Sequence, residues 1–288
     1  MQNLTEFSRI YRGMLRRLNR FQPLDSFPFI SGDSYYFACQ FHFRSGELRK
    51  VFSKGGRFQK DKSIFVAVGD VGEFISFLSE IPWEDFTEYS LVLHNGDDEI
   101  SLEQLEKLAS RVQFIYGVNL SSSNGDLIPI PIGLENRKYF TNGIPNDFKK
   151  QISLGLPKIE NRKILLLQSF SNNTNELERQ SCAEVALELK ATKIAGVTPK
   201  QYRSTLTQSR FVLSPAGNGS DCHRTWEAMY LGAIPIVRRA HWPFIGLDLP
   251  VLVVDEWRDL LAQDLDKFTV PHNPTWNQEF WDSFYHEN

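Results

Sequence analysis

The residue types that could hold an anionic ligand are concentrated in one segment, residues 210–237. It reads RFVLSPAGNGSDCHRTWEAMYLGAIPIV, so an apolar strand, a glycine-containing loop, a helix and a second apolar strand follow one another. Gly217 and Gly219 let the loop backbone approach a ligand closely. The helix would direct its free N–H groups and the positive end of its dipole towards the loop, which favours phosphate. The segment therefore predicts a nucleotide-diphosphate site.

Helical spacing within this segment predicts two faces. One stripe is expected in the core and consists of Trp226, Met229, Tyr230 and Cys222. The other flank carries His223, Arg224 and Glu227. Arg224 can supply charge to a diphosphate, and Glu227, one turn further on, can accept hydrogen bonds from the two hydroxyls of a ribose. An exposed ion pair with Glu227 is the structural alternative, but the surrounding loop and strands favour ligand binding.

The ends of this helix also carry signals. Asp221 or Ser220 is expected to cap its start, and Gly232 is expected to end it. The loop lacks both the GxGxxG spacing of a dinucleotide fingerprint and the GKS or GKT of a P-loop. Neither of those two kinds of phosphate site is therefore predicted.

The rest of the chain alternates strands and helices, which predicts mostly parallel sheets with right-handed crossovers. In the first half, strands are expected at residues 35–41, 63–68, 89–93 and 112–116, with helices at 72–80 and 101–110 and extended chain at 128–133. Ser101 and Gln104 have the form of a capping box. A second unit is expected to contain strands at 164–168, 211–213, 234–237 and 251–254, a helix at 175–190, and a helix that begins at Thr198 and Pro199. Residues 142–163 are the expected linker.

Residues 211–237 resemble the nucleotide-sugar site of GT-B glycosyltransferases, most closely the exostosin-like ones. The resemblance rests on FVLSP, the glycine loop and RTWEAMYLGAIPIV, with LHNGD at 93–97 and IPIGLEN at 130–136 in the first half. It implies two Rossmann-like α/β domains facing a cleft. Residues 1–150 would bind the acceptor, residues 151–265 would bind the nucleotide sugar, and residues 266–288 would return to the first domain.

The activity implied by this resemblance is transfer of a sugar from a nucleotide-diphosphate sugar, expected to be a UDP-sugar, to a hydroxyl of an oligosaccharide or glycan. The expected donor-binding residues are Ser214, Gly217, Asn218, Gly219, Ser220, Asp221, His223, Arg224 and Glu227. Ser169 and Arg179 are expected as further contacts, because ligands collect at the carboxyl ends of parallel strands. A non-catalytic nucleotide- or glycan-binding module and a GT-B sugar-nucleotide epimerase are the alternatives.

An inverting transfer needs a base for the acceptor hydroxyl. Asp97 and Asp70 each follow a predicted strand of the first half, and His94 is a third candidate. Asp97 ranks first because it belongs to LHNGD. A role in a turn or helix cap is the structural alternative for each, and a retaining reaction would need no base at that place.

A bound metal is not expected, nor is any cofactor besides the nucleotide sugar. The one Asp-x-Asp triplet, Asp264 to Asp266, lies in AQDLDKF, which reads as a solvated helix face. The helix N-terminus and the arginines would replace a metal at the diphosphate.

Bulk properties limit the partners and the compartment. The formal net charge of −3 gives no reason to expect nucleic acid, and no apolar run is long enough to span a bilayer. Residues 1–20 read as an amphipathic helix without a signal-type apolar stretch. A sequon at Asn218 would put a glycan on the ligand loop. A cytoplasmic protein is therefore expected, with a truncated protein of the secretory pathway as the alternative.

Overall fold

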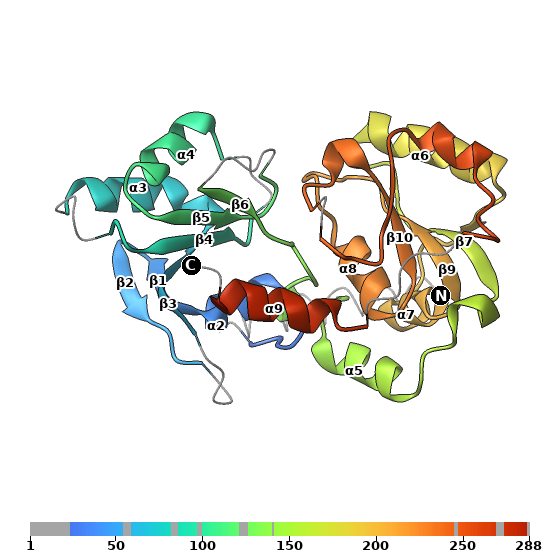
Figure 1. The fold of residues 1–288 in the computed structure, drawn as a ribbon, viewed down its shortest axis with the longest axis horizontal. Helices are drawn as coiled ribbons and strands as arrows, with labels where there is room; N and C mark the ends of the chain where they lie inside the picture. Colours follow the sequence, from blue (N-terminus) through green and yellow to red (C-terminus); the bar gives the residue numbers. More distant parts are fainter. Residues whose placement is uncertain are drawn as a thin grey trace, which may run out of the picture.

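The computed structural model describes residues 24–53, 59–81, 86–96, 100–120, 126–139, 141–244, 247–268 and 274–286. The helix predicted over residues 1–20 and the candidate base Asp97 lie outside this part of the chain. The described residues form two mostly parallel β-sheets with helices packed on both faces of each (Figure 1). The α/β class and the parallel pairing predicted from the sequence are thus confirmed.

The first sheet has the strand order β2-β1-β3-β4-β5-β6. Its strands are β1 (Cys39–Arg44), β2 (Glu47–Lys50), β3 (Lys60–Ala67), β4 (Ser90–His94), β5 (Phe114–Gly117) and β6 (Leu127–Pro129). All neighbours pair in parallel except β1 and β2, which form a hairpin. The carboxyl ends of β3 to β6 therefore lie at one edge of the sheet.

The second sheet has the order β11-β10-β9-β7-β8, and all of its pairs are parallel. Its strands are β7 (Ile164–Gln168), β8 (Thr192–Lys193), β9 (Ser209–Leu213), β10 (Ile234–Arg238) and β11 (Leu252–Val254). The apolar run ILLLQ of β7 suits a central strand with both faces covered. From β7 the chain continues to β8 on one side and then crosses to β9 on the other. The boundary between β7 and β9 is therefore a topological switch point.

In the part of the chain that the structure describes, eight α-helices connect and cover these strands. They are α2 (Gly32–Ala38), α3 (Val71–Ser79), α4 (Leu102–Ala109), α5 (Pro145–Ser153), α6 (Glu176–Glu188), α7 (Pro199–Leu206), α8 (His223–Tyr230) and α9 (Trp276–His286). The predicted capping box at Ser101 and Gln104 is present, and α7 begins with a second one formed by Thr198 and Gln201. Each cap contributes about 1 kcal/mol of stability to its helix.

Two predictions about local structure are wrong. The strand expected at 35–41 is largely helix α2, because Ser31 caps a helix by accepting from Ser34 N. The helix expected around Asp264 is a turn after the 3₁₀ helix Trp257–Ala262, and Asp264 pairs there with Lys267. The linker expected at 142–163 stays a prediction. These residues lie between β6 of the first sheet and β7 of the second, and they contain α5, whose Phe148 is fully buried.

The predicted division into residues 1–150, 151–265 and 266–288 remains a prediction, and its first boundary falls inside α5.

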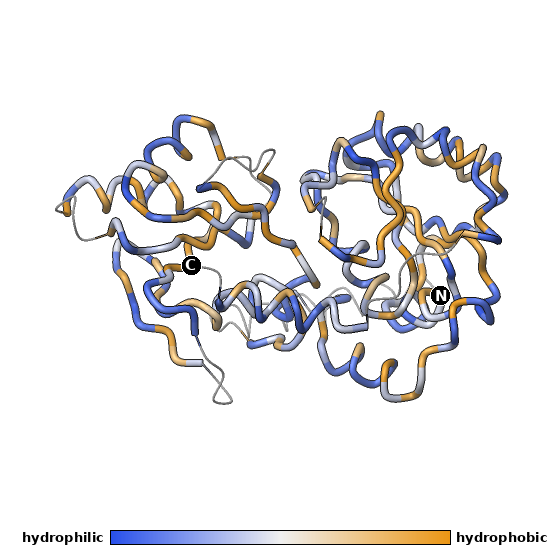
Figure 2. Tube along the Cα trace, viewed as in Figure 1, coloured by the Kyte–Doolittle hydropathy of each residue, from blue (hydrophilic) through white to orange (hydrophobic). Residues whose placement is uncertain are grey.

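Apolar residues are concentrated along the strands of both sheets (Figure 2). Helices α3 and α4 pack on one face of the first sheet. Helix α9, far along the chain, lies beside α2 on the other face and contacts β3 (Figure 1). Trp281 and Phe284 of α9 both pack on Tyr35 of α2, each at 5.4 Å between ring centroids.

Candidate functional site

A large pocket lies where the carboxyl ends of both sheets meet, with a volume of about 990 Å³. Its first wall is built from segments that follow β4, β5 and β6, namely His94, Asn95, Gly96, Asn119, Ile132, Glu135, Asn136, Tyr139, Thr141 and Asn142. Its second wall comes from the second sheet and comprises Ser169, Thr174, Arg179, residues 194–197, Pro199, Tyr202, residues 217–219, residues 221–224 and Glu227. The pocket therefore occupies the place where ligands bind in open α/β sheets, at the switch point between β7 and β9.

The glycine loop, residues 216–220, borders this pocket and is tightly packed. A Cβ on Gly217 would lie 2.7 Å from Nη2 of Arg179, and a Cβ on Gly219 would lie 2.4 Å from the amide of Asn119. Gly217 N donates to Gly219 O at 3.0 Å, so this N–H is used within the loop. The two glycines are therefore required for close approach to neighbouring side chains, and neither adopts positive φ.

Arg179 of α6 fixes the glycine loop through hydrogen bonds to backbone carbonyls. Its Nε donates to the carbonyl of Ala216 at 3.0 Å, and its Nη1 donates to the carbonyl of Ser171 at 2.8 Å. Burial and the neighbouring charge of Arg224 lower the pKa of Arg179. This side chain, expected as a donor contact, thus lies in the pocket wall and also fixes the two loops that follow β7 and β9.

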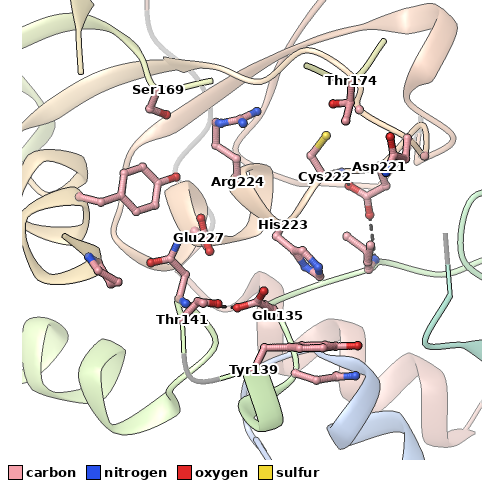
Figure 3. Close-up of a pocket in the computed structure, with 18 of the residues that line it drawn as sticks. Glu135, Tyr139, Thr141, Ser169, Thr174, Asp221, Cys222, His223, Arg224 and Glu227 are labelled. Carbon is pink, nitrogen blue, oxygen red and sulfur yellow. Dashed lines mark hydrogen bonds between the residues drawn. The ribbon is translucent and has the colours of Figure 1, made fainter. Parts of the chain in front are cut away.

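Arg224 is the second residue of α8 and points into the pocket (Figure 3). Its guanidinium carbon lies 5.6 Å from the ring centroid of Phe170. Its Nη1 is buried and has no hydrogen-bond partner among the described residues. Thr141 and Asn142 on the opposite wall also carry buried oxygens without a partner there. Because unpaired buried polar atoms are costly, these groups indicate a polar ligand.

Glu227 lies one turn further along α8 and is 3% exposed. Burial raises its pKa to about 7, while a hydrogen bond from Tyr202 and the charge of Arg224 act in the opposite direction. The carboxylate of Glu135 raises the pKa of Glu227 further. The predicted flank of Arg224 and Glu227 therefore does face the pocket, although Glu227 is buried in its wall.

Asp221 differs from the prediction that it, or Ser220, caps α8. The N-cap of α8 is Cys222, and no side chain caps it. The carboxylate of Asp221 instead accepts from the indole of Trp226, at 2.8 and 2.9 Å, and from Ile132 N at 2.8 Å. Its burial raises its pKa to about 7. Asp221 therefore borders the pocket with its oxygens already hydrogen-bonded.

The other donor candidates fall into two groups. His223 and Asn218 line the pocket, and His223 Nδ1 lies 2.7 Å from the carbonyl of Gly133. Ser169 lines it too, directly after β7. Ser214 and Ser220 do not line it, and the buried Ser214 Oγ forms a hydrogen bond with Thr225 Oγ1 at 2.8 Å.

The core stripe predicted for α8 needs one correction. Trp226, Met229 and Tyr230 are buried, as expected. Cys222 is only half-buried and lines the pocket, because as the N-cap it precedes the helical turn that carries the stripe. Gly232, at φ 71°, follows the last residues of α8 as predicted.

Two of the three base candidates, His94 and Asp70, fall among the described residues, and the pocket does not bring these two together. His94 lines the pocket, but its ring is almost fully buried against Tyr35 and its Nδ1 accepts from Asn95 N at 2.7 Å. Burial and the charge of His223 lower the pKa of His94 to about 4. Asp70 occupies the N-cap position of α3 and does not line the pocket. Asp97 is beyond the described residues.

Most residues of the first wall were not predicted as site residues from the sequence. Asn136 fixes the backbone of this wall. Its side chain donates to Asn95 Oδ1 at 2.6 Å and accepts from Asp33 N at 3.0 Å. Asp33 in turn accepts from Arg137 N at 3.0 Å, and burial raises the pKa of Asp33 to about 6. Asn95 and Asn136 belong to the motifs LHNGD and IPIGLEN, which entered the sequence analysis only through the family resemblance. These two motifs were the signal in the sequence that could have pointed to this wall.

Comparison with known proteins gives one family match. Residues 160–244 match the model of the RXYLT1 C-terminal domain, a xylosyltransferase-related family. Nothing matches among the curated proteins. No helix in the described part of the chain has the length and apolar character required to cross a membrane. The matched segment contains Arg179, Arg224 and Glu227, and the match supports a glycosyltransferase-related function.

Proposed function

We propose that the pocket binds a nucleoside-diphosphate sugar and transfers its sugar to a hydroxyl of a glycan. The observation that carries this proposal is Nη1 of Arg224, a buried cationic group without a partner among the described residues. It lies beside a glycine loop, at the first turn of a helix and at the switch point of a parallel sheet. Charge, helix dipole and topology therefore all favour an anion at this position.

In this proposal the diphosphate lies between Arg179 and Arg224, and Glu227 accepts from the ribose hydroxyls. The nucleobase faces Tyr202 and residues 194–197, which line the adjoining part of the wall. The acceptor approaches along the polar first wall, so the two Rossmann-like halves would act as the domains of a GT-B enzyme. A UDP-sugar is the proposed donor, and the family match makes a pentosyl donor such as UDP-xylose the first to test.

The two arginines have a defined chemical part in this reaction. The leaving diphosphate gains negative charge as its bond to the sugar breaks, and fixed cations in a buried wall stabilise that charge. We propose that they perform this role without a divalent metal, in an inverting transfer. Asp264 and Asp266 of the Asp-x-Asp triplet do not line the pocket, and they lie at the surface in ion pairs with Lys267 and Arg210.

The binding test uses titration calorimetry with UDP, GDP, UDP-xylose and UDP-glucose on the wild type, Arg224→Ala and Glu227→Ala. Loss of a charge-assisted contact at Arg224 should weaken binding about 10- to 100-fold. Arg258→Ala is the matched control, because Arg258 is exposed on the 3₁₀ helix outside the pocket. Equal affinity in the wild type and Arg224→Ala would show that the donor site is elsewhere.

Turnover separates the proposal from its alternatives. Release of UDP is measured with a pooled set of glycan acceptors and without any acceptor. Acceptor-dependent release supports a transferase, and tight binding without turnover supports a binding module. Conversion of the free UDP-sugar into its epimer, without an acceptor, supports an epimerase.

A further inference from the structure

Three of the described residues that line the pocket carry carboxylates, namely Glu135, Asp221 and Glu227. The oxygens of Asp221 are held by Trp226 and Ile132. Glu227 lies in the second wall, next to Arg224, where the proposed donor binds. Glu135 alone among the three projects from the first wall, where the acceptor would enter (Figure 3).

The position of Glu135 is fixed by its surroundings. It directly follows Leu134, which forms a parallel bridge with Ser31 and is completely buried. Its Oε2 accepts from Asn142 N at 3.3 Å, which closes the short loop from 135 to 142. Glu135 is half-buried, so one side of its carboxylate is held by the wall while the residue still borders the open pocket.

Glu135 also faces the donor side. Its charge raises the pKa of Glu227 across the pocket, so the two carboxylates share one space. Figure 3 shows the Glu135 side chain directed towards His223, the first residue of α8. A hydroxyl placed against Glu135 would therefore face a sugar held at the first turn of α8.

We propose that Glu135 is the general base of the transfer, an inference that rests on the proposed function. The acceptor oxygen forms a bond to the anomeric carbon, and the bond from that carbon to the diphosphate oxygen breaks. The bonding electron pair leaves with the diphosphate, between Arg179 and Arg224. The hydroxyl proton passes to Glu135, which becomes a neutral carboxylic acid and then returns the proton to water. Attack from the first wall, opposite the leaving group, gives inversion at the anomeric carbon.

His94 suits this role less well than Glu135. Its Nε2 is buried and its Nδ1 accepts from Asn95 N, so an acceptor hydroxyl cannot reach either nitrogen directly. Asp70 lies outside the pocket lining. Asp97 falls beyond the described residues and is compared by mutation.

The experiment compares Glu135→Gln, Glu135→Ala and Asp97→Asn with the wild type, using UDP release and UDP affinity. Glu135→Gln keeps an oxygen for Asn142 N, so UDP affinity should stay within about twofold while turnover falls about 10²- to 10⁴-fold. Glu160→Gln, at an exposed carboxylate far from the pocket, is the matched control and should be unaffected.

Azide rescue distinguishes a base from a residue that only shapes the loop. Azide is already an anion and attacks without losing a proton, so it should restore UDP release in Glu135→Ala and give a glycosyl azide of inverted configuration.

A Glu135→Gln enzyme that binds UDP and turns over at the wild-type rate overturns the inference and leaves the proposed function intact. If Asp97→Asn loses turnover while Glu135→Gln keeps it, the inference is likewise overturned and the proposed function is left intact. A wild type that binds no nucleotide sugar overturns the proposed function itself.

Discussion

Asp221 accepts a hydrogen bond from the backbone N–H of Ile132 at 2.8 Å, across 89 residues of sequence. The same carboxylate accepts from the indole of Trp226 in α8, and the Asp221 N–H donates to Asn119 at 3.2 Å. One residue therefore ties the loop before α8 to two segments of the first half. Together with the contact between His223 and the carbonyl of Gly133, it holds the two pocket walls against each other.

Asp221→Ala should lower the free energy of unfolding by about 2–4 kcal/mol, because it leaves the Trp226 indole and the Ile132 N–H buried without a partner. Chemical denaturation measures the change. Asp126→Ala, which truncates an exposed aspartate in a turn, should cost less than about 0.5 kcal/mol. Equal costs at the two positions would mean that the Asp221 contacts do not stabilise the fold.

Stability should fall as the pH rises from about 4 to about 7. Burial raises the pKa of Glu227 and of Asp221 to about 7, so the folded chain holds protons there that the unfolded chain has already lost. A raised carboxyl pKa makes the slope of stability against pH negative in that window. Glu227→Gln should reduce the difference in unfolding free energy between pH 5 and pH 8 by about 1–3 kcal/mol.

The same substitution should weaken nucleotide-sugar binding if Glu227 contacts the ribose, so the variant would be more stable above pH 7 and less functional. Glu160→Gln provides the control for the pH series, since its carboxylate is exposed. If the unfolding free energy of Glu227→Gln changed with pH as steeply as that of the wild type, burial of the Glu227 carboxyl would not be the cause of the pH dependence.

Two glycine substitutions should have opposite effects. In Gly219→Ala the new Cβ would lie 2.4 Å from the amide of Asn119, which must move and lose its bond to Asp221 N. We expect a loss of about 1–2 kcal/mol and weaker UDP binding. In Gly72→Ala the Cβ meets nothing within 4 Å and lies within α3, so stability should rise by about 0.5–1 kcal/mol. Thermal unfolding with and without UDP measures both, and a neutral Gly219→Ala would contradict the close packing.

Tyr230→Phe should loosen α9. The Tyr230 hydroxyl accepts from Ile30 N at 2.7 Å and donates to Asn277 Oδ1 at 2.7 Å, so it connects α8, the segment before α2 and α9. Removing it should cost about 1–3 kcal/mol and increase proteolysis within residues 274–286. Tyr139→Phe, at an exposed tyrosine, is the matched control for stability. Unchanged cleavage of α9 in Tyr230→Phe would show that other contacts hold it.

Strong local patterns predicted most of the second sheet. The ILLLQ run gives β7 at the predicted residues, and Thr198 with Pro199 begins α7 as expected. These signals are local, since a continuous apolar run or a capping residue acts within a few positions. The two-residue strand β8 carries no such pattern and was missed.

The predictions that failed depend on contacts between distant segments. Aromatic residues at 35–41 favour a strand locally, but residues 35–38 belong to α2, which Ser31 caps and whose Tyr35 packs against α9. Asp221 reads as a helix cap from its position, whereas its partners Ile132 and Trp226 draw the carboxylate elsewhere. Glu135 gave no chemical signal of its own, because its place opposite Glu227 arises only when the two sheets meet.

The docking of α9 on the first sheet has a consequence for how the chain is made. Phe284 covers Tyr116 of the sheet and Tyr35 of the adjoining helix α2, so this side of the sheet stays open until residues 276–286 leave the ribosome. By then the whole second sheet has been synthesised. The first sheet, which is translated before the second, is thus the later of the two to complete its core, and a nascent chain stalled before α9 would present an aromatic surface to chaperones.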